Sequence, residues 1–253
     1  MCHAYYGIIN NGKYMKLFVL CCCALLLYTT SHAQTLVIGS SKFNPPFETW
    51  ADHSSMMYGF DFDLMTEICK RLKVKCEFKP YAFDDLFDAL KKQKVDVVIS
   101  SMIITEGRKE KYLFSLPYLA SNAQYFANSS SKLQDPDDLY GKKIGVRAAT
   151  AYSLLVESEN RKNKIVYYDE LEDMFLGLKN NEIDAAIMDY ESVKYWIAIT
   201  PGIYKLIGGK IPIGEGYAIM TNKGEENLIR AINRIILDIE TDGTFLRIYS
   251  QYF

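Results

Sequence analysis

Polar side chains stand at the ends of two short apolar segments that follow one pattern. Residues 83–101 (FDDLFDALKKQKVDVVISS) and residues 171–189 (LEDMFLGLKNNEIDAAIMD) each predict an acidic, amphipathic helix, a polar turn and an apolar strand. The first strand ends on Ser100 and Ser101, and the second ends on Asp189. In open α/β sheets, ligands bind just beyond the carboxyl ends of the strands. We therefore expect these hydroxyl and carboxylate groups to line the two walls of a binding cleft.

The repeated pattern predicts an α/β protein with two similar lobes rather than one large sheet. The chain leaves the first unit near Ser121 and returns to it near residues 213–216. We therefore place lobe 1 at residues 34–121 and 215–253 and lobe 2 at residues 122–214. The two crossings between them are expected to act as hinges.

The first 33 residues have the pattern of a secretory signal peptide. Lys13 and Lys16 precede an apolar stretch at residues 17–27, which is shorter than the roughly 20 residues that a membrane-spanning helix needs. Ser31-His32-Ala33 then offers a small-x-small cleavage site. We expect residues 1–33 to be removed when the protein is exported.

Export determines how the cysteines are interpreted. Cys21, Cys22 and Cys23 lie in the signal peptide. Lipid attachment to one of them is disfavoured, because no small residue other than another cysteine directly precedes any of the three. We interpret them as part of the apolar segment of the signal peptide. Cys69 and Cys76 are the pair left in the mature chain. An oxidising compartment favours one disulfide between them. A metal site is the alternative, but two thiolates without a nearby histidine make a poor one.

The composition argues against several classes of function. The formal net charge of −2 becomes −4 when Lys13 and Lys16 are removed, so neither nucleic acid nor an anionic membrane is an expected partner. His53 is the single histidine of the mature chain, which leaves little for a catalytic triad or a histidine-based metal site. No G-x-S-x-G, P-loop or dinucleotide fingerprint occurs. We expect no metal, no cofactor and no enzymatic reaction.

Several short motifs occur in a fixed order along the mature chain. They are Pro45-Pro46-Phe47-Glu48, Gly59-Phe60-Asp61-Phe62-Asp63-Leu64, Ser100-Ser101-Met102, Ile104-Thr105-x-x-Arg108, Leu139-x-Gly141-Lys142-Lys143-Ile144-Gly145-Val146, Asp184-Ala185-Ala186-x-x-Asp189 and Asp242-Gly243-Thr244-Phe245. Each is weakly specific, but the ordered set, with Cys69 and Cys76, resembles the polar amino-acid-binding proteins of bacterial ABC importers. The arginine and lysine/arginine/ornithine binders are the most similar. The resemblance implies a two-lobed type II periplasmic-binding fold, a periplasmic monomer and an inner-membrane ABC permease as partner.

The resemblance also implies how the ends of an amino acid are held. Arg108 matches the position that grips the α-carboxylate, where a planar guanidinium meets a carboxylate in two parallel hydrogen bonds. Thr105 is expected to N-cap the short helix that carries it. Asp189 matches the position that holds the α-ammonium, with help from Ser101 and, less directly, Ser100. The alternatives are an exposed arginine in a charged run and an aspartate that only caps the following helix.

Further positions match residues around the ligand. Thr150 and Ala151 match the turn that completes the carboxylate site with a side chain and backbone N–H groups. Phe83 matches a position against the ligand's side chain, where a guanidinium could stack; plain core packing is the alternative. Asp61 matches an acid that reaches toward a distal cation, and stabilising a helix N-terminus is its alternative role.

The chain departs from the family pattern at four further positions around the ligand. Ala149 stands where the family usually has a glycine before the Thr or Ser of the turn. Ile103 replaces a Ser, Thr or Asp, so one side-chain ligand of the ammonium is missing while the backbone N–H remains. Ser41 stands where lysine and arginine binders often carry an acid, and Asn44 stands where they carry a tyrosine. These departures bear on which side chain the pocket accepts.

We therefore expect the binding subunit of an amino-acid importer, with arginine as the leading ligand, other basic amino acids next and glutamine as the neutral alternative. A secreted dehydratase of the prephenate/arogenate kind is the rival, because that enzyme uses the same fold. It would need a general acid in the cleft, which the shortage of histidine disfavours. A sensor that docks on a receptor kinase, rather than on a permease, is a further alternative.

Overall fold

The computed structural model describes residues 34–51, 56–159 and 161–253. The predicted signal peptide at residues 1–33 lies outside these ranges. Within them, no helix combines the length and the apolar character needed to cross a bilayer.

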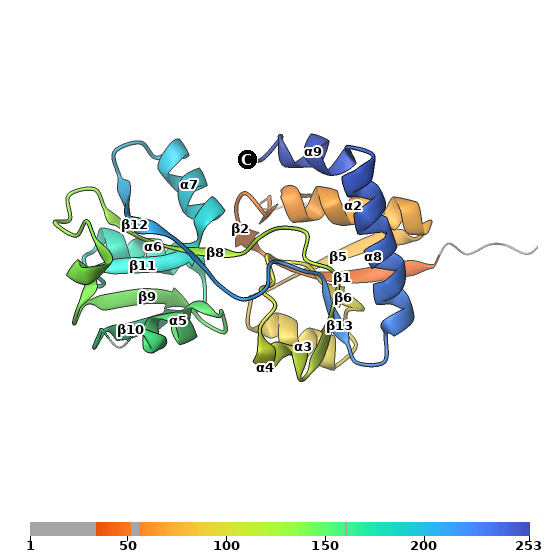
Figure 1. Ribbon diagram of the computed structural model, residues 1–253, viewed down its shortest axis with the longest axis horizontal. Coiled ribbons are helices and arrows are strands. Elements are labelled where there is room, and N and C mark those ends of the chain that lie inside the picture. Colours follow the sequence, from red (N-terminus) through yellow and green to blue (C-terminus); the bar gives the residue numbers. More distant parts are fainter. Residues whose placement is uncertain (1–33, 52–55, 160) are drawn as a thin grey trace, which may run out of the picture. The chain divides into compact units, whose positions relative to one another are not determined.

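The first five-stranded sheet has the order β5-β1-β6-β13-β7. Its strands are β1 (Thr35–Ser41), β5 (Lys75–Tyr81), β6 (Val97–Val98), β7 (Tyr112–Phe114) and β13 (Met220–Asn222). Strand β1 pairs in parallel with β5 and β6, and β13 pairs antiparallel with β6 and β7. The helices of this part are α2 (Phe60–Leu72), α3 (Asp85–Lys91), α4 (Glu106–Lys109), α8 (Glu226–Thr241) and α9 (Thr244–Tyr249) (Figure 1). This sheet therefore joins β1, from the beginning of the described chain, to β13, which comes from its C-terminal part.

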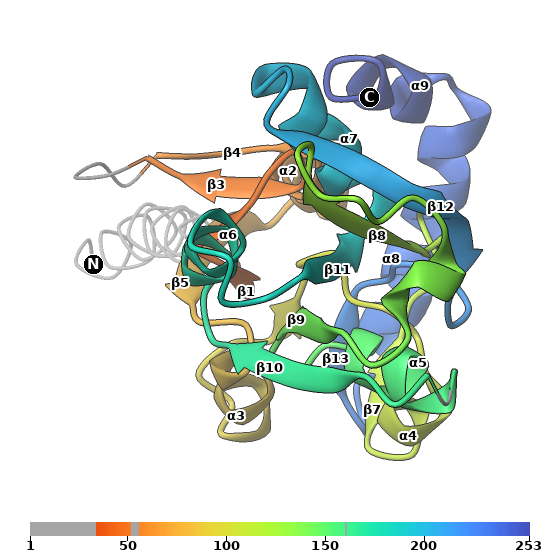
Figure 2. The ribbon, with the colours of Figure 1, turned by 90° about the vertical axis from the view of Figure 1, so that its left-hand side faces the viewer.

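The second five-stranded sheet has the order β10-β9-β11-β8-β12. Its strands are β8 (Asn122–Asn128), β9 (Lys143–Arg147), β10 (Lys164–Tyr168), β11 (Ala185–Asp189) and β12 (Tyr204–Pro212), seen in Figure 2. Its helices are the 3-10 helix η1 (Pro136–Leu139), α5 (Tyr152–Ser158), α6 (Leu171–Lys179) and α7 (Tyr190–Ile199). The predicted repeat is confirmed as two helix–strand units, α3 with β6 and α6 with β11.

Two connections join the strands of the sheets, one from β7 to β8 and one from β12 to β13. They run side by side, because Tyr217 N donates to Leu119 O (2.8 Å) and Ile213 N donates to Ser121 O (3.2 Å). We propose the lobe boundaries at these connections, with residues 34–121 and 215–253 in lobe 1 and residues 122–214 in lobe 2. A three-stranded sheet of β2 (Phe43–Asn44), β3 (Glu48–Trp50) and β4 (Met57–Tyr58) follows β1.

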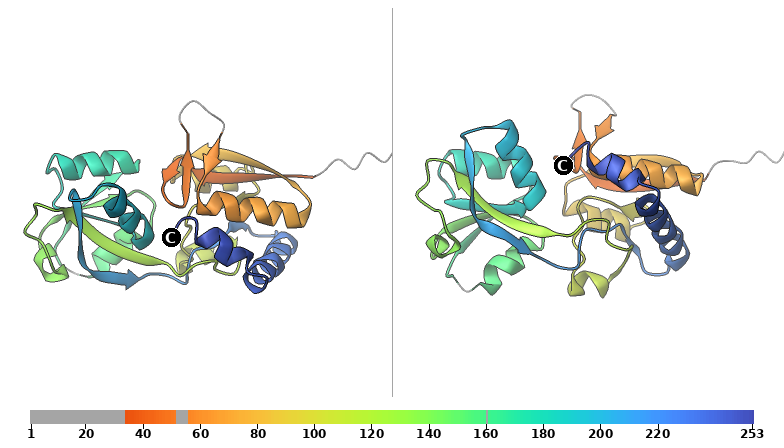
Figure 3. Two further views of the ribbon diagram at one scale, coloured as in Figure 1. Left: turned by 90° about the horizontal axis from the view of Figure 1, so that it is seen from above. Right: turned by 45° about the horizontal axis from the view of Figure 1, so that its top comes forward.

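Helix α8 shows how the apolar pattern builds the core. Its isoleucines at helical spacing are buried: Ile229, Ile232, Ile235, Ile236 and Ile239. Burying one such side chain contributes roughly 1.5–3 kcal/mol. The face is buried partly against α2 and α9, which lie beside α8 in both views of Figure 3.

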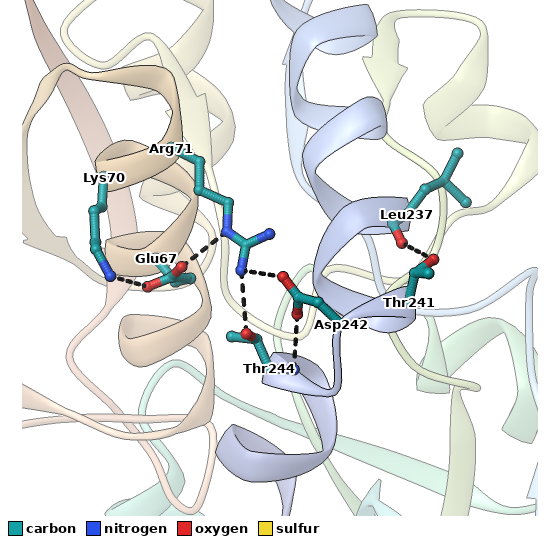
Figure 4. Close-up of polar contacts among 7 residues, drawn as sticks. All are labelled: Glu67, Lys70, Arg71, Leu237, Thr241, Asp242 and Thr244. Atoms are coloured by element: carbon teal, nitrogen blue, oxygen red, sulfur yellow. Dashed lines mark hydrogen bonds and ion pairs between the residues drawn. The ribbon is translucent and has the colours of Figure 1, made fainter.

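A polar cluster fastens α2 to the turn between α8 and α9 (Figure 4). Arg71 Nε contacts Glu67 Oε1 at 2.8 Å, and Arg71 Nη2 contacts Asp242 Oδ2 at 2.8 Å and Thr244 Oγ1 at 3.1 Å. Thr244 N donates to Asp242 Oδ1 at 2.9 Å, while Gly243 between them has φ +79°. The Asp-Gly-Thr motif near the end of the chain thus forms a turn whose Asp242 and Thr244 side chains bind Arg71 of α2.

The predicted disulfide between Cys69 and Cys76 is confirmed. It joins α2 to β5, with the two Cα atoms 5.9 Å apart. A disulfide stabilises the folded state because it reduces the entropy of the unfolded chain. For a loop this short the reduction is small, and the chain-entropy model gives about 2–3 kcal/mol of stabilisation. The bridge therefore ties the helix that carries Asp61 to the edge strand of the first sheet.

Candidate functional site

A pocket of about 340 Å³ brings residues of the two sheets together. Strand ends, turns and helix starts supply its lining: Asn44, Phe83, Ser101, Ile103, Arg108, Arg147, Thr150, Ala151, Tyr152, Leu171, Met188 and Asp189. Of the binding residues predicted from the sequence, Ser41, Asp61 and Ser100 are outside this lining. The others meet in one pocket, although they come from distant parts of the chain.

Arg108 lies on α4 and spans the pocket wall. Thr105 caps this helix as predicted, and its side chain accepts a hydrogen bond from Arg108 N (3.4 Å). The guanidinium donates through Nη1 to Ile103 O (2.7 Å) and through Nη2 to Ala149 O (2.9 Å). Burial lowers the pKa of the Arg108 guanidinium to about 10, so the group remains charged at neutral pH. Arg108 is therefore a fixed cation, not a free surface arginine.

Asp189 ends β11 and is 6 % exposed. Its carboxylate accepts hydrogen bonds from Tyr152 OH (2.7 Å) and Asn44 Nδ2 (3.2 Å). It occupies the N-cap position of α7, but its side chain makes no capping hydrogen bond. Burial raises the pKa of Asp189, and hydrogen bonds from Tyr217, Tyr152 and Asn44 oppose that rise. The side chain thus faces the pocket rather than the helix.

Asn44 connects the two strand ends that the sequence singled out. Its Nδ2 atom also donates to Ser101 Oγ (3.0 Å), while its Oδ1 atom accepts from Ser192 Oγ (3.1 Å). Ser101 has φ +39°, and its backbone N–H donates to Asp61 Oδ2 (2.7 Å). A left-handed conformation at a non-glycine residue needs such support. The asparagine therefore holds Ser101 and Asp189 in one hydrogen-bonded network.

Asp61 lies behind Ser101 and does not reach into the pocket, contrary to expectation. It is fully buried, and Tyr118 OH donates to its Oδ2 atom (3.0 Å). Burial raises the pKa of Asp61 to about 7, although the hydrogen bonds from Ser101 and Tyr118 act in the opposite direction. The carboxylate supports the backbone of Ser101 instead of offering a charge to a ligand.

Ser41 and Ser100 also face away from the pocket, toward Glu48. Both hydroxyls donate to Glu48 Oε1, each at 2.5 Å. Glu48 is fully buried, and burial raises its pKa well above the ordinary value, with the Asp61 charge adding to the rise. Sequence reasoning noticed Glu48 only as part of a motif and missed this role. Its position beside two prolines and a phenylalanine gave no sign of it.

Thr150, Ala151 and Phe83 line the pocket as predicted. Thr150 Oγ1 donates to Arg147 O (2.6 Å), which fixes the turn before α5. Ala149, in the same turn, has φ +59° where the resemblance expects glycine. Phe83 is 5 % exposed and also belongs to the core beneath α3, so its alternative role in packing is realised as well.

Sequence reasoning missed Arg147, Tyr152, Leu171 and Met188. Arg147 is 4 % exposed, and its Cζ atom lies 4.8 Å from the centre of the Phe83 ring. It ends β9, so the rule that places ligands beyond the carboxyl ends of strands could have identified it, as it identified Asp189. The pocket therefore contains two arginines and one aspartate.

The chain is similar to known proteins over most of its length. The family model for bacterial extracellular solute-binding proteins, family 3, matches residues 36–253. The ABC transporter arginine-binding protein 1 of Escherichia coli (strain K12) is 30% identical, and the match covers 94% of this chain and 98% of that protein.

Solved structures share the fold across the same region. An arginine 3rd transport system periplasmic binding protein from Legionella pneumophila is 56% identical, with a TM-score of 0.86 over 87% of this chain and 100% of that one. An ancestral arginine-binding protein bound to glutamine is 33% identical, with a TM-score of 0.81 over 87% of this chain and 97% of that one. The fold is the two-lobed type II periplasmic-binding fold. The chain belongs to the bacterial extracellular solute-binding proteins, family 3.

Proposed function

We propose that this protein captures a free L-α-amino acid in the pocket and delivers it to the permease of an ABC importer. One observation carries the proposal: Arg108 and Asp189, of opposite charge, line the same pocket of about 340 Å³. A zwitterion presents the complementary pair of charges.

The carboxylate end is assigned to Arg108 with Thr150 and Ala151. Two N–H groups of Arg108 are already directed at backbone carbonyls, which holds the guanidinium plane still. A fixed guanidinium binds a carboxylate with little loss of side-chain entropy. Burial around it strengthens the charge-assisted hydrogen bonds.

The ammonium end is assigned to Asp189 and Ser101. Asp189 keeps acceptor capacity after its bonds from Asn44, Tyr152 and Tyr217, because a carboxylate offers about four lone-pair sites. Ser101 supplies its hydroxyl or carbonyl oxygen. Ile103 has no polar side chain, so its contribution is limited to its backbone.

Arginine is the first candidate ligand, because the relatives above are arginine-binding proteins. Glutamine is the second. It is supported by the relative bound to glutamine and by Arg147, a donor at the wall of the pocket. Since Asp61 lies behind Ser101, a distal cation does not find the acid that the sequence led us to expect.

The mature protein is proposed to work in the periplasm as a binding subunit without chemistry of its own. The rival, a prephenate or arogenate dehydratase, would need a general acid in the pocket. Asp189 is the one carboxylate among the lining residues, and it accepts hydrogen bonds rather than standing free to donate a proton.

A thermal-shift screen of the mature protein against the twenty amino acids, ornithine and citrulline tests the proposal. A ligand at a hundredfold excess over its dissociation constant adds about 2.7 kcal/mol to the free energy of unfolding. We expect arginine or glutamine to give the largest rise in melting temperature, and Arg108→Ala to abolish it. Turnover of prephenate, with no amino acid raising the melting temperature, would replace binding by catalysis.

A further inference from the structure

Arg147 combines deep burial with unused hydrogen-bond donors at the wall of the pocket. It is 4 % exposed, and its Nε and Nη2 atoms are buried without a hydrogen-bond partner among the described residues. Its guanidinium remains protonated in a protein. A buried donor without a partner costs free energy, and a charged one costs more than a neutral one. The side chain is therefore placed to gain from an acceptor that enters the pocket.

The acids around Arg147 do not provide that acceptor. Burial lowers the pKa of Arg147, whereas the charges of Glu48, Glu170, Asp189 and Glu172 raise it. In the part of the chain that the structure describes, none of them forms an ion pair with Arg147 within 4.0 Å. Glu48 and Asp189 accept hydrogen bonds from their own serine, asparagine and tyrosine neighbours. They stabilise the charge of Arg147 at longer range and leave its donors open.

Arg147 also occupies the aromatic surface that a cationic ligand would use. Its Cζ atom lies 4.8 Å from the centre of the Phe83 ring, within the range of a cation–π contact. A ligand guanidinium that stacked on the same face would have to move Arg147 away. A cation that stayed beside it would meet a like charge in a buried site.

The charges of the lining residues also indicate that Arg147 faces the side chain of the ligand. The charged lining residues are Arg108, Arg147 and Asp189. Under the proposed function, the α-carboxylate pairs with Arg108 and the α-ammonium pairs with Asp189. Arg147 is then the cation left for the side chain of the ligand.

We infer that Arg147 is a specificity-determining residue, which favours amino acids whose side chains end in a carbonyl or carboxylate oxygen and opposes cationic side chains. The inference rests on the proposed function, because it assigns the rest of the pocket to the α-groups. A planar guanidinium can meet such an oxygen with two donors while its face stays on Phe83. Glutamine and glutamate carry that group at the end of a side chain, and arginine and lysine carry the opposite one.

Titration calorimetry with four ligands on Arg147→Met tests the inference. Methionine keeps an unbranched chain against Phe83 but removes the donors and the charge. We expect the dissociation constant of glutamine or glutamate to rise at least tenfold, and that of arginine to change less than threefold or to fall. Arg147→Lys, which keeps the charge without the planar fork, should lie between. Lysine completes the panel as the second cationic ligand.

The ratio of dissociation constants on one sample is the readout, because a loss of folded protein lowers every apparent stoichiometry alike and leaves the ratio unchanged. Arg234→Met, on the exposed surface of α8, is the control and should leave the ratio as it is. A ratio that moves less than threefold in Arg147→Met overturns the inference. Wild-type protein that binds arginine but neither glutamine nor glutamate overturns it too. Wild-type protein that binds no amino acid overturns the proposed function first, and the inference with it.

Discussion

The two ends of the pocket differ in how far their hydrogen bonds are completed within the protein. At the end assigned to the α-groups, Arg108 donates to two backbone carbonyls, and Asp189 accepts from Asn44 and Tyr152. At the end assigned to the side chain, Arg147 has two buried donors without partners among the described residues. The first end is organised before a ligand arrives. The second depends on the ligand for its completion.

This difference separates what is general about amino-acid binding from what is selective. A preorganised clamp loses little entropy on binding, so it contributes affinity for any α-amino acid. An unpaired buried donor discriminates strongly between ligands. A ligand that supplies no acceptor leaves the donor buried without a partner, so its complex is less stable than that of a ligand that supplies one. We therefore expect changes at the clamp to weaken all ligands together, and changes at Arg147 to reorder them.

The largest expected effect comes from Arg108→Ala. It should weaken arginine and glutamine by similar amounts, about 2–5 kcal/mol, which is the range for removing one partner of a buried charge pair. Titration calorimetry measures the loss, and circular dichroism should show an intact fold. Lys109→Ala is the matched control, since Lys109 forms exposed ion pairs with Glu106 and Glu215. A loss below threefold would show that the carboxylate lies elsewhere.

Asp189→Asn should have the next largest effect. The amide keeps the size of the side chain but replaces a charged acceptor by a neutral one, so we expect about 1.5–3 kcal/mol of lost affinity, the range for hydrogen bonds to charged groups. Both ligands should weaken alike in calorimetry. Asp173→Asn, on the exposed face of α6, serves as the control. Selective loss of one ligand would instead place the Asp189 carboxylate at the side-chain end.

Among cationic ligands, arginine should bind more tightly than lysine by at least tenfold, about 1.4 kcal/mol. A guanidinium is planar and weakly hydrated, and it can spread its five donors over several neutral acceptors, whereas an ammonium depends on a concentrated negative charge. The one carboxylate of the lining is assigned to the α-ammonium. Competition binding with both ligands measures the ratio. Equal affinities would mean that an acid reaches the side-chain end after all.

The smallest effect on binding is expected from Asp61→Asn, which should change affinity at neutral pH less than threefold because Asp61 lies behind the lining. Its effect should appear in the pH dependence of stability. Burial raises the pKa of Asp61 to about 7 in the folded protein, above its value of about 4 in an unfolded chain. Between these values the folded state holds the extra proton, so the free energy of unfolding should fall as the pH rises from 4 to 7.

Thermal unfolding from pH 5 to pH 8 measures that dependence. The melting temperature should fall with rising pH in the wild type and fall less steeply in Asp61→Asn, since the amide does not titrate. Glu48 and Asp189 have raised pKa values of their own, and their charges and the hydroxyl of Tyr118 act on Asp61. The slope should therefore be reduced rather than abolished. An unchanged slope would assign the titration to Glu48 instead.

The sequence indicates the residues of the proposed clamp, and Phe83 at the other end of the pocket, but not Arg147. Asp189 and Ser101 could be singled out because each ends an apolar run, and strand ends collect where a cleft forms, whereas the role of Arg108 was implied by the family resemblance. The apolar repeat likewise predicts the helix–strand units, and the isolated cysteine pair predicts the disulfide. These features depend on local pattern and on a simple rule of topology.

What the sequence does not determine is the direction of a side chain relative to distant backbone. Asp61 and Glu48 stand beside motif residues, yet whether a carboxylate faces the pocket or the serines behind it depends on segments tens of residues away. Arg147 ends its strand just as Asp189 does, but it looks like an ordinary cation after Lys143-Ile144-Gly145-Val146. Its burial against Phe83 follows from the meeting of two lobes, which no local pattern encodes.

Under the proposed export, the bridge between Cys69 and Cys76 has a consequence for how the protein reaches its folded state. Residues 34–253 contain these two cysteines and no others, so a mature chain can form a single intramolecular disulfide and has no wrong partner to exchange. The two thiols are seven residues apart, and loops of that length close within roughly 10–100 ns. Oxidative maturation should therefore require an oxidant but no isomerase. Its rate should follow the rate of thiol oxidation rather than any later rearrangement.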